Sequence, residues 1–147
     1  MNRQCSASLL TFAVVMAATA FAAEPGKVEV QGWKASTKLE SVVAGYLTEL
    51  NGKYKLRLTE ATFQPGGYVG DHHHLAPGIR LVTSGELTFV RGNETTVYKA
   101  GDTFFEAGDV THTVYNRGSA PVVLLIFEVV PVDLQGSTIT PVAATSR

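Results

Sequence analysis

The feature that most restricts the fold of this chain is an alternation of apolar and polar side chains, broken at short intervals by turn-forming residues. Segments 54–63, 85–92 and 95–101 alternate in this way or are rich in Val, Thr, Tyr and Phe, which is typical of half-buried strands. Turn formers such as Asn51-Gly52 separate them. About ten strands fit at turn spacings of roughly eight to twelve residues, and helical periodicity is almost absent. The pattern predicts an all-β chain folded as a β-sandwich or barrel.

The N-terminal segment differs from the rest of the chain. A polar stretch whose only charge is Arg3 precedes an apolar run that ends in small residues, with Ala20 and Ala22 in an A-x-A pattern. This order predicts a signal peptide over residues 1–22, cleaved after Ala22, and export to the periplasm or out of the cell. An uncleaved membrane anchor is the alternative, although the run is shorter than the roughly 20 residues that a span needs. Cys5 would leave with the leader, so the mature chain could not use a cysteine nucleophile.

The remaining segment, 23–147, is long enough for one domain and has no visible linker. The whole chain has a net charge of -1, which gives no electrostatic footprint for nucleic acid or anionic lipid. Dinucleotide, phosphate-loop and serine-hydrolase motifs are absent as well. We expect no nucleic-acid partner, and no membrane association after the leader is cleaved.

The last third of the chain suggests a second subunit. Residues 120–132 form a nearly continuous, β-branched apolar run, which predicts a strand buried on both faces. One face would line the barrel, and the other would meet another layer or a partner chain, so we expect a homodimer. The tail, 136–147, has no pattern and is predicted to be loose or an exchanged edge strand.

Three of the four histidines are adjacent, as His72, His73 and His74. Successive side chains on a strand point to opposite faces, so His72 and His74 share one face and His73 lies on the other. Two imidazoles at this spacing can converge on one metal ion, provided that a third ligand comes from elsewhere. The only other histidine is His112, which lies on a separate predicted strand.

At these positions the chain resembles the cupin family, whose two motifs place histidines at the same spacings. Segment 66–85 resembles the first motif, through Gly66, His72, His74 and Gly85. Segment 101–116 resembles the second, through Gly101, His112 and Asn116. The resemblance implies a jelly-roll β-barrel over residues 23–147 with one divalent transition metal held by His72, His74 and His112. It also implies a small-molecule ligand in the barrel.

The chain departs from the family at the motif glutamate, whose position is Gly78. Three imidazoles without a carboxylate can hold iron, zinc, copper, nickel or manganese and leave positions open for water or substrate. Some cupins, among them thiol dioxygenases, work with a three-histidine face. The alternative is that these histidines are remnants of a metal-binding ancestor.

Two charged residues are weaker candidates for the site. If the strand after Pro77 keeps Gly78 on the site face, Arg80 shares that face and could grip a substrate carboxylate or enolate. A bulge could instead turn Arg80 outward, or it could pair with an acid such as Glu106. Glu106 could accept a hydrogen bond from a ligand imidazole or act as a general base, or it could simply be solvated.

Other polar and aromatic side chains are predicted to be structural. Asn116 resembles the family's asparagine, and we expect it to make hydrogen bonds that hold the fold. The aromatic residues are expected to belong to the core or an interface, and they are Trp33, Phe104, Phe105 and Phe127.

Three functions are compatible with these observations. We expect a metal-dependent oxidoreductase, dioxygenase-like, that acts on a small organic molecule at the three-histidine site. The second is a non-catalytic module that binds a small ligand or a metal. The third is a metal-independent isomerase or sugar-modifying cupin, which would have no need of three convergent histidines.

Overall fold

Nine antiparallel strands make up residues 26–142, the part of the chain that our computed structural model describes. Their bounds are β1 Val30–Val42, β2 Tyr54–His74, β3 Gly78–Ser84, β4 Glu86–Arg91, β5 Glu94–Lys99, β6 Thr103–Glu106, β7 His112–Tyr115, β8 Val122–Pro131 and β9 Ile139–Pro141. The all-β prediction is confirmed, and residues 26–142 contain no helix that could cross a bilayer. The predicted signal peptide lies outside the described residues.

Strand β2 organises the sheet because it pairs with four other strands. Its first half pairs with β8, its second half with β7 and β9, and β1 follows it on both sides of a bend. The bend falls at Gly66 and Gly67. Gly66 has a φ of 75°, in the left-handed region that favours glycine. A Cβ on Gly67 would stand 2.8 Å from the carbonyl oxygen of Gln64 and 2.9 Å from that of Gly32. The bend lets one strand belong to both sides of the barrel.

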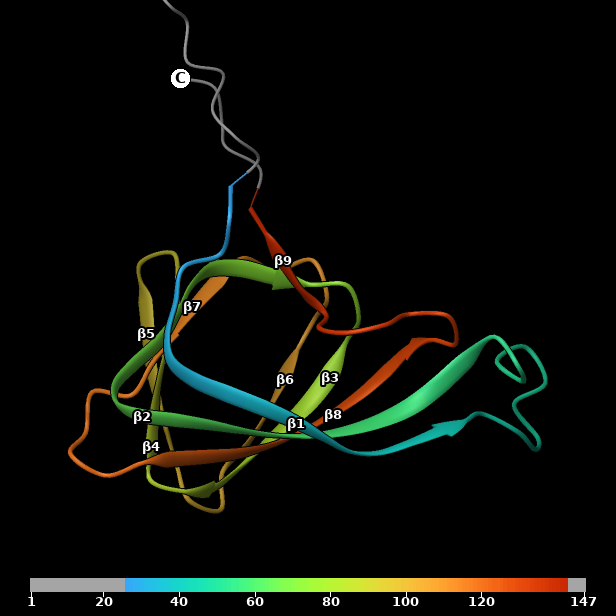
Figure 1. Cartoon of the computed structure of the whole chain (residues 1–147), viewed down its shortest axis with the longest axis horizontal. Helices are drawn as coiled ribbons and strands as arrows, with labels where there is room; N and C mark the ends of the chain where they lie inside the picture. Colours follow the sequence, from blue (N-terminus) through green and yellow to red (C-terminus); the bar gives the residue numbers. More distant parts are fainter. Residues whose placement is uncertain (1–25, 143–147) are drawn as a thin grey trace, which may run out of the picture.

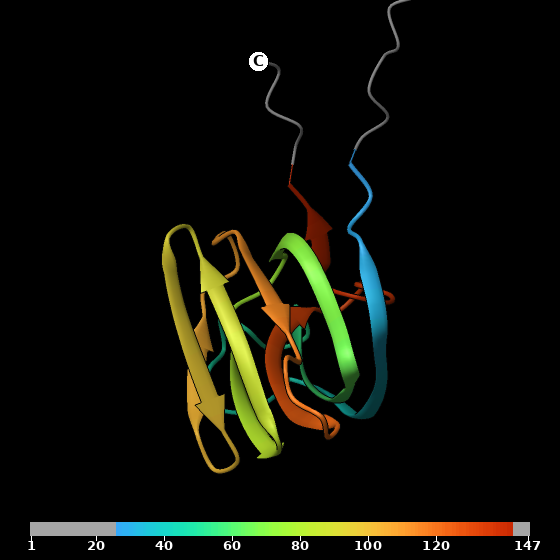
Figure 2. The ribbon, with the colours of Figure 1, turned by 90° about the vertical axis from the view of Figure 1, so that its left-hand side faces the viewer.

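The strands curl around a shared apolar interior, with β4 and β5 on one side and β1 on the opposite side (Figures 1 and 2). The core consists of buried residues from six strands, namely Ala61, Phe63, Val69, Val82, Leu87, Phe104, Val114, Val122 and Leu124. Segments 75–77 and 107–111 connect strands at the same end of the barrel, where the backbone N–H of His74 donates to the Gly108 carbonyl at 2.7 Å. The predicted metal ligands lie at this end.

Strand β8 buries one face within its own chain, as predicted, and leaves open the face for which we predicted another layer or a partner chain. Its residues alternate between buried positions, such as Val122 and Val130, and positions that are only half-buried or exposed. Phe127 is 43% exposed, and the register places it beside Ile79, which in turn lies beside Phe105. The apolar run covers the core with one face only, and its other face adds to an exposed apolar row on the outside of the barrel.

The tail folds back onto its own chain. Residues Ile139–Pro141 form β9, which pairs with His72–His74 on β2. This short edge strand was predicted to be loose or exchanged, and in the structure it completes the wall beside the histidines. Residues 143–147 lie outside the described part.

Candidate metal centre

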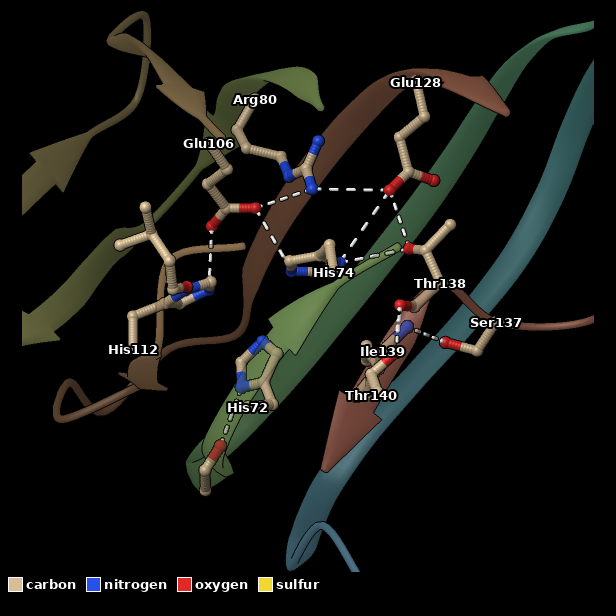
Figure 3. Close-up of polar contacts among 12 residues, drawn as sticks. His72, His74, Arg80, Glu106, His112, Glu128, Ser137, Thr138, Ile139 and Thr140 are labelled. Atoms are coloured by element: carbon tan, nitrogen blue, oxygen red, sulfur yellow. Dashed lines mark hydrogen bonds and ion pairs between the residues drawn. The ribbon is translucent and has the colours of Figure 1, made fainter. Parts of the chain in front are cut away.

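Three histidines converge inside the barrel. His72 and His74 project inward from β2, and His112 projects inward from the start of β7, directly across from His72 in the strand register (Figure 3). All three side chains are buried, and their candidate ligand atoms lie within 4.8 Å of one another. His73 is half-buried, pairs with Thr140 of β9 and is not part of the cluster. The two-residue parity therefore separated the three adjacent histidines correctly.

Backbone carbonyls fix the orientation of two of the rings. The Nδ1 of His72 lies 2.7 Å from the carbonyl oxygen of Gly70, and the Nδ1 of His112 lies 2.9 Å from that of Val110. A carbonyl can only accept a hydrogen bond, so each Nδ1 carries the proton. In a neutral ring this leaves the lone pair on Nε2, which faces the other histidines. These partners prepare both rings as metal ligands.

His74 is oriented by two residues that the sequence analysis missed. Its Nδ1 lies 3.1 Å from the hydroxyl of Thr138, which donates to Glu128 at 2.7 Å. Because Thr138 uses its proton on Glu128, the ring must donate to the hydroxyl, and its Nε2 is again left free. The sequence does hold a signal that Glu128 has a specific role, since it is the only charged residue in the apolar run 120–132 and a buried charge needs a partner. Thr138 had none, because it lies in the patternless tail.

Arg80 and Glu106 both lie inside the barrel and contact each other. Arg80 is 2% exposed, as its two-residue spacing from Gly78 predicts, and its Nη2 lies 2.6 Å from Glu106 Oε2 and 3.4 Å from Glu128 Oε1. Glu106 is buried rather than solvated, because this guanidinium compensates its charge. Its two oxygens also lie 3.1 Å from His112 Nε2 and 3.3 Å from His74 Nε2.

Burial sets the charge state of the cluster. Burial, reinforced by the nearby His112, lowers the pKa of His72 to about 4. Burial also lowers the pKa of His74 to about 3, against the opposing effect of Glu106. For Glu106 burial acts to raise the pKa, but contacts with His112 and Arg80 outweigh it and hold the pKa at about 2. At neutral pH His72 and His74 are thus neutral and Glu106 is ionised, which are the states that bind metal.

Comparison with known proteins agrees with this architecture. The family model of the cupin domain matches residues 59–128, which contain both histidine segments, and cupin structures match the fold. The chain is a cupin.

Solved structures share the fold of this cupin at low sequence identity. A cupin domain from Bordetella pertussis has 19% identity and a TM-score of 0.51, over 69% of this chain and 96% of that one. The polyketide cyclase RemF from Streptomyces resistomycificus has 18% identity and a TM-score of 0.54, over 79% of this chain and 80% of that one. The Cupin_2 domain of an XRE family transcriptional regulator from Enterobacter cloacae has 20% identity and a TM-score of 0.50, over 67% of this chain and 96% of that one. No curated protein matches the chain.

Asn116 holds the cupin fold near the core. It is 1% exposed, its Nδ2 donates to the carbonyls of Phe63 and Ala120, and its Oδ1 accepts from the backbone N–H of Gly118. All three bonds tie chain segments together and none contacts the histidines. This geometry agrees with the structural role that we predicted.

The aromatic residues are divided between the core and the outer surface. Phe104 is buried and stacks on Tyr98 at 4.0 Å, and Trp33 packs against the same core. Phe105 and Phe127 are exposed on the outside of the barrel.

The histidines border three cavities. A cavity of about 40 Å³ lies among the three rings, Arg80 and Glu106. A cavity of about 170 Å³ adjoins it beside Glu106 and His112, and one of about 240 Å³ adjoins it beside His74. The histidines of this cupin can therefore be approached from two sides.

Proposed function

We propose that this cupin is a metal-dependent oxidoreductase, dioxygenase-like, that acts on a small organic molecule. The observation that carries the proposal is the convergence of His72, His74 and His112, each with its Nδ1 hydrogen-bonded. Such rings suit one divalent transition metal, whether iron, zinc, copper, nickel or manganese, and leave positions for other ligands. When bound, the metal would supply Lewis acidity and a template for the reactants.

The charged residues around the histidines support this use. Arg80 contacts Glu106 and Glu128, so its charge is already compensated inside the barrel. We therefore assign it the positioning of these carboxylates in preference to the capture of a substrate anion. Glu128, through Thr138, holds His74 with its Nε2 directed into the site.

The cavities limit where an organic substrate could lie. The central cavity of about 40 Å³ has room for a few water molecules or one small polar group, because one water needs about 10–15 Å³ of such space. A larger substrate would occupy one of the two adjoining cavities, of about 170 and 240 Å³, and reach the centre with one polar group. The small central cavity also favours a second candidate, a non-catalytic module that binds a metal or a small ligand.

Metal analysis of the purified protein tests the proposal. We expect one metal ion per chain in the wild type, and loss of the metal in His72→Ala and in His112→Ala. His73→Ala is the matched control, since its ring is outside the cluster, and it should keep the metal. Stoichiometric metal in both ligand variants would overturn the site.

Oxygen uptake then separates the two candidate functions. The loaded protein is offered organic acids, phenols and diketones while dissolved oxygen is recorded. Uptake that depends on a substrate and is lost in His112→Ala supports the oxidoreductase. A loaded protein that consumes no oxygen and converts none of these compounds supports the binding module.

We also propose that the protein is exported and forms a homodimer. Support for export is the leader pattern over residues 1–22, and the mass of the mature chain tests the cleavage after Ala22. Support for the dimer is the exposed apolar row of Phe127, Ile79 and Phe105, which a second copy of this surface would cover.

A further inference from the structure

Gly78, at the position of the motif glutamate, has no room for a side chain. A Cβ there would clash with Arg80 Nη1 and with the carbonyl oxygen of Phe127, and it would stand 3.0 Å from Glu128 Cγ. The oxygen of Phe127 belongs to the backbone of β8, which pairs with β3, so it cannot move aside alone. In this barrel the packing itself requires glycine at position 78, and no carboxylate can project from there.

The adjacent strand supplies a carboxylate at the same level. Glu106 of β6 is the register partner of Gly78 on β3. Residues directly opposite in an antiparallel pair project from the same face of the sheet, and both are buried here. Glu106 therefore enters the interior one strand away from the position where the family motif places its glutamate.

The distances suit two ligands of one ion. Ligand atoms that each lie about 2.1 Å from a metal are about 3.0 Å apart at a right angle and about 3.4 Å apart at the tetrahedral angle. The Glu106 oxygens lie 3.1 Å from His112 Nε2 and 3.3 Å from His74 Nε2. Both contacts fall within that range.

The polarity of the contact with His112 also calls for a cation. His112 donates its Nδ1 proton to Val110, so in the neutral ring Nε2 is an acceptor that faces a carboxylate, which is also an acceptor. Within residues 26–142, the buried His112 Nε2 has no hydrogen-bond partner, and the atom it faces is Glu106 Oε1. Two buried acceptors repel each other unless a proton or a metal ion lies between them.

We propose that Glu106 is the fourth protein ligand of the metal, and that it replaces the motif glutamate from the neighbouring strand. The inference rests on the proposed metal centre. Arg80 contacts Glu106 Oε2 at 2.6 Å and positions the carboxylate, while Oε1 faces His112. The site then resembles a mixed nitrogen and carboxylate set, with a net charge one unit lower than that of three imidazoles alone.

Titration with Co²⁺, followed by its visible absorption bands, tests this assignment. In Glu106→Ala we expect altered bands and a loss of Co²⁺ affinity above the roughly 10- to 100-fold that removal of an outer partner costs. Added acetate should restore the wild-type bands by occupying the vacated space, whereas acetamide, which is of equal size but uncharged, should not. His73→Ala is the matched control, because its ring lies beside the site on the same strand but outside the cluster. It should keep both the wild-type bands and the wild-type affinity.

The possible failures are distinct. A wild type that takes up no Co²⁺ overturns the metal centre, and the ligand role of Glu106 with it. A wild type that binds Co²⁺, together with an alanine variant of unchanged bands and less than tenfold weaker binding, overturns only the role of Glu106. If the alanine variant does not fold, Glu106→Asp decides, since it keeps the charge but draws the carboxylate back by one methylene. Unaltered Co²⁺ bands in that variant would also overturn the assignment.

Discussion

Thr138 offers a sharp test of how the centre is held, because its hydroxyl links His74 Nδ1 at 3.1 Å to Glu128 at 2.7 Å. Thr138→Val keeps the shape of the side chain and removes that link. Loss of such an outer partner costs about 10- to 100-fold in metal affinity, or about 1.4–2.8 kcal/mol. We expect a value toward the upper end, since Thr138 is only 4% exposed and water has little access to replace the hydroxyl.

The assay is competition for the metal with a chromophoric chelator at neutral pH. Thr138→Ser is the matched control, because it keeps the hydroxyl and should bind within a few-fold of the wild type. Thermal unfolding of the metal-free proteins shows whether the barrel itself has changed. A valine variant that binds as tightly as the wild type, or a serine variant as weak as valine, would refute the reasoning.

Three further predictions concern stability and assembly. Asn116→Ala removes three hydrogen bonds, one buried and two part-buried, so urea unfolding should show a loss of up to about 3 kcal/mol at about 1 kcal/mol each. Metal stoichiometry should stay unchanged in the folded protein, and little loss of stability would refute the structural role of Asn116. Below pH 6.5 the unfolded chain protonates His72 and His74, whereas the folded rings stay neutral to about pH 4 and 3. As the pH is lowered below 6.5, the free energy of unfolding of the metal-free protein should therefore decrease, by up to about 1.4 kcal/mol per pH unit for each ring. A flat profile would contradict the burial of neutral rings. Phe105→Glu should convert the proposed dimer to a monomer in sedimentation velocity, and an unchanged dimer would place the interface elsewhere.

Much of the fold and part of the site follow from short-range patterns in the sequence. The two-residue alternation gave the strands, and the same parity placed His72 and His74 together and His73 apart. Counting from Gly78 gave Arg80 an inward position on the condition that no bulge follows Pro77, and the alternative pairing with Glu106 is the contact that the structure shows. These predictions hold because side-chain direction on a strand depends on backbone geometry alone.

The remaining parts of the site depend on which strands meet, and the sequence does not encode that locally. The pairing of Gly78 with Glu106 follows from the β3–β6 register, and the contact of Thr138 with His74 follows from the return of the tail to β2. Glu106 is buried only because Arg80 arrives from another strand to compensate its charge. What covers the outer face of β8 also lies beyond the local pattern, since an apolar run does not reveal its partner.

The short strand β9 has a kinetic consequence for the proposed metal centre. It contributes three residues to the wall beside His72–His74, directly after the threonine that orients His74. Short edge strands open locally at a small fraction of the free energy of global unfolding. Each opening of β9 would release His74 from Thr138 while the other two rings kept their backbone partners. The rate of metal exchange should therefore follow the opening of this strand, measured by amide hydrogen exchange at Leu75, whose N–H donates to the Thr138 carbonyl at 2.9 Å.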